Sequence, residues 1–247
     1  MIRKIFLGIG LLLAGYYGYR AVSPPVEFFP KQEASALGKI FLLGETHNDE
    51  LCLKKEIKYW KHCYDTYGFR HLFMEESYAT AQFLNLWMQA ENDEILNQLE
   101  QDRECAHLDS FGPNVIKFFK TIKDSCPQTI FHGTDVAHLF KSTDQRYLDY
   151  LEAQGQRDSE AYQRTQENIE QGKCIYINNG FDWDTREFMM VQNFIREFDA
   201  LGGLGTMGIY GSAHLYRECF QKITIPRMIE QLIEHYGRIV RGKFAGD

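Results

Sequence analysis

Four short apolar runs, each ended by glycine or a polar residue, constrain most strongly how this chain can fold. They occupy residues 39–43, 71–75, 129–132 and 206–210. Runs of this length bounded by turn residues are typical of buried strands. Helical patterns occupy residues 49–66, 78–91, 93–105, 113–124, 143–173 and 183–200, and a last helix begins near Pro226. Strands that alternate with helices predict a single α/β domain with a mainly parallel central sheet flanked by helices.

The amino terminus has a different pattern. Arg3 and Lys4 precede an apolar run over residues 5–19, which Arg20 closes. A basic start before an apolar stretch is typical of a secretory signal or a signal anchor. No small-x-small cleavage sequence stands near Arg20, which favours an uncleaved anchor over a cleaved signal peptide.

The expected organisation follows from this pattern. Residues 1–22 are predicted to be the signal anchor or signal peptide, residues 23–38 a linker, and residues 39–247 the α/β domain. Basic residues before the apolar run predict that the domain lies outside the cytoplasm, in the periplasm or at the cell surface, with the membrane as partner of the first segment.

Composition narrows the classes of partner. The chain is 44% hydrophobic and 25% charged, which is typical of a folded globular protein, and its net charge is −7. An acidic chain argues against a nucleic-acid partner. The basic residues Arg238, Arg241 and Lys243 are interpreted as a solvated end.

Six cysteines in an exported chain permit disulfides, but no C-x-x-C pair occurs, and free thiols remain an equal alternative.

Polar residues follow each predicted strand. The strands run into Gly44-Glu45-Thr46-His47, Glu75-Glu76, Gly133-Thr134-Asp135 and Gly211-Ser212-Ala213-His214. In parallel α/β sheets, ligands bind beyond the carboxyl ends of the strands. Side chains far apart in the sequence therefore meet in one crevice, and the two Gly-x-x-His sequences point to a functional site there.

Several segments together resemble a known group of proteins. They are Gly44-Glu45-Thr46-His47-Asn48-Asp49, Glu75, Arg186-Glu187-x-x-Met190-x-x-Asn193 and Gly211-Ser212-Ala213-His214, with smaller similarities at Asn85-Leu86-Trp87 and Gly133-x-Asp135. This combination resembles the superfamily of erythromycin esterases, ChaN-type haem-uptake proteins and TIKI/TraB proteases. The resemblance extends from about Ile40 to His214 and covers nearly the whole predicted domain.

The branches of this group match to different degrees. His47 follows Gly44 by three positions, as in the ChaN and TIKI branches, whereas erythromycin esterases have one more residue between Glu and His. The first motif is thus closest to the ChaN-like branch. The Arg186-Glu187-x-x-Met190 segment suits either the esterase or the ChaN branch.

The candidate residues carry the groups that hydrolysis of an ester or amide needs. His47 or His214 can take a proton from water. Glu45 and Glu75 can orient the imidazoles or act as bases themselves, and Arg186 can stabilise an oxyanion or bind a substrate carboxylate. The four residues His47, His214, Glu45 and Glu75 also form a workable set of ligands for a divalent metal. The absence of a G-x-S-x-G sequence argues against a serine-hydrolase mechanism.

Plainer interpretations stand beside these. Glu76 is expected to face solvent, because neighbours in a strand point to opposite sides. Asp135 is expected to cap the following helix, and an ion pair of Arg186 with Asp182 or Asp184 is as reasonable as a role in the site. The remaining histidines lack such a context and are interpreted as structural or exposed: His62, His71, His107, His132, His138 and His235.

Three functions remain open from the sequence. The first is an extracytoplasmic hydrolase that acts on an ester or amide bond of a small molecule or peptide through Glu45, His47, Glu75, Arg186 and His214. The resemblance implies that this hydrolase is metal-dependent if it follows the TIKI branch and not if it follows the esterases. The second is a ChaN-like protein that binds haem or a metal without hydrolysis, and the third is a non-catalytic module.

Overall fold

The computed structural model describes residues 38–105, 112–178, 181–217 and 222–246. The predicted anchor at 1–22 and all of the predicted linker except Gly38 lie outside it. In the described part, no helix is both long enough and apolar enough to cross a membrane.

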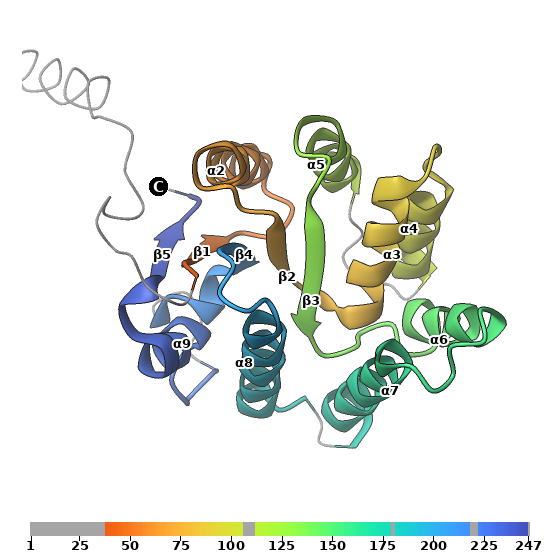
Figure 1. Cartoon of the computed structure of the whole chain (residues 1–247). Helices are drawn as coiled ribbons and strands as arrows, with labels where there is room; N and C mark the ends of the chain where they lie inside the picture. Colours follow the sequence, from red (N-terminus) through yellow and green to blue (C-terminus); the bar gives the residue numbers. More distant parts are fainter. Residues whose placement is uncertain (1–37, 106–111, 179–180, 218–221, 247) are drawn as a thin grey trace, which may run out of the picture. The chain divides into compact units, whose positions relative to one another are not determined.

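A five-stranded sheet forms the centre of the fold (Figure 1). Its strands are β1 (Ile40–Glu45), β2 (His71–Ser77), β3 (Ile130–Asp135), β4 (Thr206–Gly211) and β5 (Val240–Phe244). Their order is β3-β2-β4-β1-β5, and every neighbouring pair is parallel. The predicted α/β class with a parallel sheet is therefore confirmed for the described residues. The basic carboxyl-terminal segment, interpreted as a solvated end, is instead the edge strand β5.

Eight α-helices surround the sheet among the described residues. They are α2 (Glu50–Tyr67), α3 (Tyr78–Gln89), α4 (Glu94–Cys105), α5 (Gly112–Ser125), α6 (Thr143–Ala153), α7 (Glu160–Lys173), α8 (Trp183–Ala200) and α9 (Met228–Tyr236). The segment 143–173, predicted to be helical, forms two helices, because a turn separates α6 from α7. Gly155 in that turn has a φ of +69°, a conformation that glycine adopts without strain.

Side-chain caps fix where several helices begin. Asp49 accepts a hydrogen bond from the Cys52 amide at the start of α2, and Ser77 accepts one from Thr80 at the start of α3. Asp182 caps α8 by accepting from the amides of Asp184 and Thr185. Such caps satisfy amides that have no partner inside the helix.

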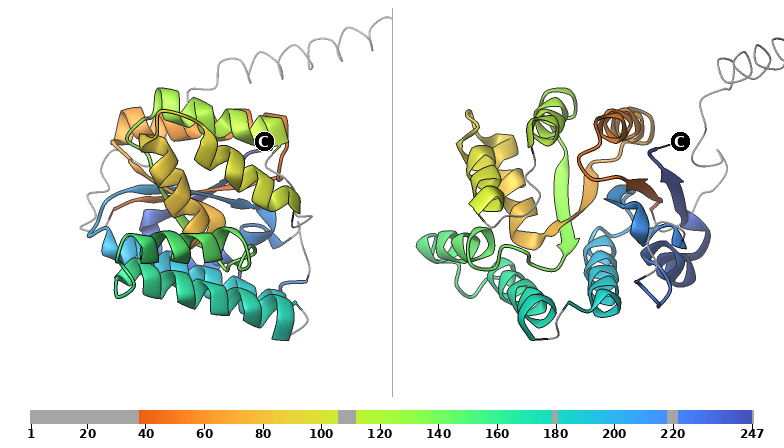
Figure 2. Two further views of the ribbon diagram at one scale, coloured as in Figure 1. Left: turned by 90° about the vertical axis from the view of Figure 1, so that its right-hand side faces the viewer. Right: turned by 180° about the vertical axis from the view of Figure 1, so that it is seen from behind.

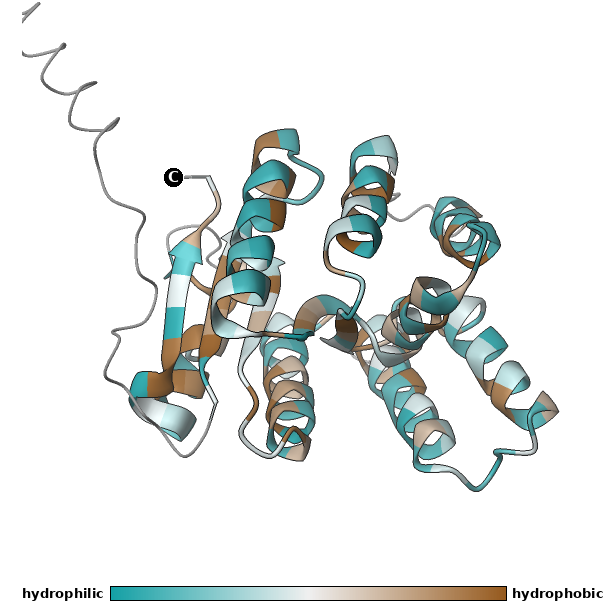
Figure 3. Ribbon diagram, turned by 45° about the horizontal axis from the view of Figure 1, so that its top comes forward, coloured by the Kyte–Doolittle hydropathy of each residue, from teal (hydrophilic) through white to brown (hydrophobic). Residues whose placement is uncertain are grey.

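The helices lie on both faces of the sheet (Figures 1 and 2). Helices α2 and α5 cover one face, α8 and α9 cover the other, and α3, α4, α6 and α7 gather beyond β3. Apolar residues of α8, α9 and two short connecting segments pack on the strands in one buried cluster: Ile40, Leu42, Phe73, Met190, Val191, Phe194, Phe198, Tyr210, Leu215, Met228, Leu232, Ile239 and Val240. Figure 3 shows the same division, with brown central strands and helices striped teal and brown.

The sheet order brings the strand ends together. Strand β4 pairs with β1 on one side and with β2 on the other. Because all strands are parallel, Glu45, Glu75, Asp135 and Gly211 lie at the same edge of the sheet. This edge carries the candidate site.

Candidate functional site

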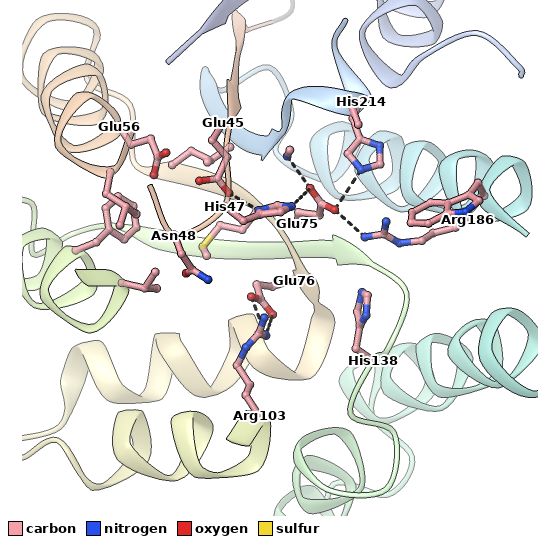
Figure 4. Close-up of a pocket in the computed structure, with 18 of the residues that line it drawn as sticks. Glu45, His47, Asn48, Glu56, Glu75, Glu76, Arg103, His138, Arg186 and His214 are labelled. Atoms are coloured by element: carbon pink, nitrogen blue, oxygen red, sulfur yellow. Dashed lines mark hydrogen bonds and ion pairs between the residues drawn. The ribbon is translucent and has the colours of Figure 1, made fainter. Parts of the chain in front are cut away.

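A cavity of about 500 Å³ opens at the carboxyl edge of the sheet. Figure 4 shows Glu45, His47, Glu75 and His214 along one side of it, with Glu76, Arg103 and His138 across from them. Apolar and aromatic residues complete the wall, among them Leu53 of α2; Val115, Phe118 and Phe119 of α5; and Tyr176, Phe181 and Trp183 before and at the start of α8. The cavity thus combines a cluster of ionisable groups with apolar and aromatic surfaces.

Glu75 is the centre of this cluster. Its Oε1 accepts a hydrogen bond from Arg186 Nη2 at 2.7 Å and lies 3.1 Å from His214 Nε2. Its Oε2 accepts from the Gly211 amide at 2.7 Å and lies 3.9 Å from His47 Nε2. Burial alone would raise the pKa of Glu75, but His214, Arg186 and His47 outweigh it and hold the pKa well below its usual range. Glu75 is therefore an ionised carboxylate.

His47 and Glu45 form a pair at the mouth of the cavity. His47 Nδ1 lies 2.8 Å from Glu45 Oε1, and the His47 side chain is 57% exposed. The hydrogen bond to Glu45 and the charge of Glu75 raise the pKa of His47 to about 9. The turn that follows places Asn48 at a φ of +61° before Asp49 caps α2. His47 is thus anchored at Nδ1, and its Nε2 lies toward Glu75.

His214 has a different environment. Its side chain is 4% exposed, Nδ1 bonds to Glu187 Oε2, and Nε2 bonds to Glu75. Glu187 Oε1 in turn accepts from the Met228 amide at 2.6 Å. Burial would lower the pKa of His214, but the attraction of Glu75 and Glu187 raises it to about 10. His214 is buried and carboxylates engage both its ring nitrogens, so it supports Glu75 and has no nitrogen open to a water molecule.

Arg186 holds two carboxylates at once. Besides Glu75, it donates to Asp135 through Nε at 3.0 Å and through Nη2. The ion pair with Asp182 or Asp184 is not formed: Asp182 caps α8, and Asp184 accepts from the Thr224 amide at 2.6 Å. The guanidinium is 7% exposed and is engaged by two anions.

Asp135 belongs to the site, which corrects its expected role as a helix cap. It is fully buried and bonds to His138 Nε2 at 2.6 Å as well as to Arg186. His138 Nδ1 lies 2.6 Å from the Tyr176 hydroxyl. His138, for which the sequence showed no functional context, therefore lies in the same cavity as the candidate residues. Its position three residues after a strand-end Asp, much like that of His47 after Gly44, was a signal for it.

Glu76 does not face solvent. Both its oxygens accept from Arg103 Nη1 at 3.0 Å, and both residues line the cavity. The register of β2 against β3 shifts between Met74 and Ser77, which interrupts the regular alternation of side chains. Glu75 and Glu76 can therefore both reach the cavity.

Glu56 of α2 is a further carboxyl group of the cavity, and no motif in the sequence marks it. It is 1% exposed, lines the cavity near Glu45 (Figure 4), and its Oε1 has no hydrogen-bond partner among the described residues. Burial, with the negative charge of Glu45, raises the pKa of Glu56 to about 10. Glu56 is therefore a neutral acid at physiological pH. Its position on the buried face of α2, between Leu53 and Trp60, was the available signal.

The four candidate metal ligands bond mainly to one another and to Arg186. Among the described residues, no group of three or more His, Cys, Asp or Glu side chains is arranged to hold a metal ion. The cysteines in this part of the chain are free thiols: Cys52, Cys63, Cys105, Cys126 and Cys174.

Comparison with known proteins reveals likeness of fold. No protein-family model matches the chain, and no curated protein matches it by sequence. Three solved structures resemble it. A Bacillus cereus protein has a TM-score of 0.60 and 14% identity, over 84% of this chain and 65% of its own. A succinoglycan biosynthesis protein has a TM-score of 0.58 and 15% identity, over 83% of this chain and 65% of its own. A mutant of the erythromycin esterase EreC in its open conformation has a TM-score of 0.57 and 12% identity, over 84% of this chain and 69% of its own.

The sequence identities and the coverages limit the likeness to the fold. The chain spans 65% of the length of the first two proteins, and the identities of 12–15% show a shared fold alone. The presence of an erythromycin esterase is consistent with the superfamily that the sequence motifs resemble. The likeness does not separate the branches of that superfamily.

Proposed function

We propose that the chain is a hydrolase of an ester or amide bond and that His47 is its general base. The observation that carries this proposal is the Glu45–His47 pair, whose imidazole is 57% exposed at the mouth of the cavity. Glu45 holds Nδ1, so in the neutral imidazole, which forms as the pH approaches about 9, Nε2 is the nitrogen that takes a proton from the attacking water. The erythromycin esterase with the same fold supports a hydrolase.

The other ionisable groups prepare this pair for the reaction. Glu75 is fixed by Arg186, His214 and the Gly211 amide, and its negative charge stabilises the imidazolium that forms when His47 takes the proton. Arg186 serves mainly to keep Glu75 and Asp135 ionised, because both anions already engage its guanidinium. His214 has the same supporting role.

The walls of the cavity suggest the class of substrate. Four aromatic side chains line it: Phe118 and Phe119 of α5, Phe181, and Trp183 at the start of α8. Ligand cavities of this kind bind molecules whose apolar parts flank a few polar groups. The proposed substrate is a small molecule or peptide with apolar or aromatic groups next to the scissile bond. The proposed location, from the sequence of residues 1–22, is outside the cytoplasm and anchored to the membrane.

The test is hydrolysis of a panel of esters, lactones and peptides by the full-length chain. The matched variants are His47→Ala and, as a control, His235→Ala at an exposed position on α9. We expect turnover that His47→Ala lowers at least 100-fold and His235→Ala leaves unchanged. Equal activity of His47→Ala and the parent chain would contradict the role of His47.

Two additions to the assay address metal and haem. Parallel reactions with manganese or with a chelator determine whether a divalent metal takes part. The ChaN-type alternative predicts a saturable change in the Soret band when haemin is added to the chain. Such a change, together with no turnover on any substrate, would favour that alternative over a hydrolase.

A further inference from the structure

A second chain of hydrogen bonds reaches the cavity, separate from the Glu45–His47 pair. It runs from Asp135 at the end of β3 through His138 to Tyr176 in the π-helical turn after α7. Both contacts are 2.6 Å, and the His138 and Tyr176 rings are 5.1 Å apart at their centroids. His138 and Tyr176 line the cavity that also contains His47. An imidazole oriented by a buried acid and bonded to a hydroxyl can transfer a proton to or from that hydroxyl.

The direction of the hydrogen bonds follows from the charge of Asp135. Burial would raise the pKa of Asp135, but Arg186 and His138 hold it far below its usual range. An ionised carboxylate only accepts hydrogen bonds, so His138 donates from Nε2. One proton then lies between His138 Nδ1 and the Tyr176 oxygen. This proton is bonded to the Tyr176 oxygen when His138 is neutral, and to Nδ1 when His138 is an imidazolium. The pair can therefore pass a proton between them.

The surroundings of Tyr176 favour one use of this relay. Burial and the negative charge of Asp135 raise the pKa of Tyr176, which keeps it a phenol and disfavours a phenolate nucleophile. Its ring packs on Phe181 with centroids 5.3 Å apart, and Phe181 packs on Trp183 at 4.2 Å. The hydroxyl thus stands beside an aromatic wall that suits the apolar leaving part of a substrate.

We propose that Tyr176 is the catalytic proton donor to the leaving group and that His138 is its positioning residue; this inference rests on the hydrolase proposed above. His47 takes one proton from water as the new C–O bond forms. The bond to the leaving oxygen or nitrogen breaks, and that atom receives the Tyr176 proton. The imidazolium of His138 then returns a proton to Tyr176 from Nδ1. His138 recovers its proton from solvent, to which its side chain is 25% exposed, and His47 releases its proton to solvent.

The experiment uses two esters with the same acyl group, taken from the best ester of the panel. One has a 4-nitrophenol leaving group, which departs without a proton, and the other has benzyl alcohol, which needs one. We expect Tyr176→Phe in the full chain to lower kcat/KM for the benzyl ester by roughly 100-fold. The 4-nitrophenyl ester should lose no more than about threefold, because general acid catalysis contributes little to it. His138→Gln should show the same split between the two esters.

The control is Tyr64→Phe, which also removes one hydroxyl, but from a tyrosine that bonds to Gln128 and does not line the cavity. It should leave both esters unchanged. Equal losses on the two esters in Tyr176→Phe and His138→Gln, or no loss on either, would overturn the proton-donor role while the hydrolase proposal stands. A parent chain inactive on both esters and on the whole panel would overturn the hydrolase proposal and this inference with it.

Discussion

Arg186 and Glu75 are 111 residues apart in the sequence, yet Arg186 Nη2 lies 2.7 Å from Glu75 Oε1. The same guanidinium also pairs with Asp135, so one cation compensates two carboxylates that are less than a tenth exposed. This contact joins the first turn of α8 to β2 and β3. The ion pairs of Arg186 therefore fix the positions of α8, β2 and β3 at the site.

The Arg186→Met variant should be strongly destabilised. It leaves Glu75 and Asp135 buried with less compensation, which typically costs about 3–5 kcal/mol. The control is Arg217→Met, which breaks the more exposed ion pair with Glu230 and should cost about 0–1 kcal/mol. Urea unfolding followed by circular dichroism measures both free energies. Similar values for the two variants would mean that Arg186 is not needed to compensate these carboxylates.

The activity should depend on the protonation of His47. A base must be neutral, and the pKa of His47 is about 9, so kcat/KM should rise with pH up to about 9. Glu45→Gln removes the largest cause of the raised pKa and should shift this rise to lower pH. The measurement is a pH–rate profile of both chains, with the His47 pKa followed by NMR. A profile that does not move in Glu45→Gln would exclude His47 as the titrating base.

The raised pKa of His214 should make the free energy of unfolding decrease as the pH rises. Its pKa rises from 6.5 to about 10 on folding, so the folded chain binds this proton more tightly than the unfolded chain. The stability it contributes is complete below pH 6.5 and is lost as the pH rises through about 10. Urea unfolding of the parent chain and His214→Gln should show a difference that shrinks over this range. A difference that stays constant with pH would contradict a protonated His214.

Glu56→Gln should stabilise the fold above pH 4.5. Folding raises the pKa of Glu56 from 4.5 to about 10, so the parent chain must take up a proton there, and glutamine removes this requirement. The gain should be about 1–3 kcal/mol near neutral pH and should vanish below pH 4.5. Glu234→Gln, at an exposed position on α9, is the matched control and should change little. Thermal unfolding at several pH values measures both, and a loss of stability in Glu56→Gln at neutral pH would contradict a neutral Glu56.

The sequence was sufficient to predict four of the five strands and to predict which distant side chains lie close together. Four apolar runs ended by turn residues predicted β1, β2, β3 and β4. The parallel arrangement then predicted that Glu45, Glu75 and His214 would lie together, which they do. Both inferences depend on local patterns and on one general property of parallel sheets.

Features that depend on tertiary context were not predictable in this way. β5 lacks an apolar run, because an edge strand can carry Arg241 and Lys243. Glu76 reaches the cavity only because the register of β2 shifts. Asp135 pairs with Arg186 instead of capping a helix, because the first turn of α8 passes over the end of β3, a long-range contact that no local pattern reveals.

The central position of β4 has a consequence for how the protein is made. β4 pairs with both β1 and β2, yet it begins at Thr206, more than a hundred residues after β2 ends. During synthesis the facing edges of β1 and β2 have no strand between them until that segment leaves the ribosome. Contacts between residues so far apart in sequence slow folding, and uncovered strand edges favour aggregation. The edges of β1 and β2 that β4 covers therefore stay unpaired, and open to aggregation, until more than a hundred further residues have been made.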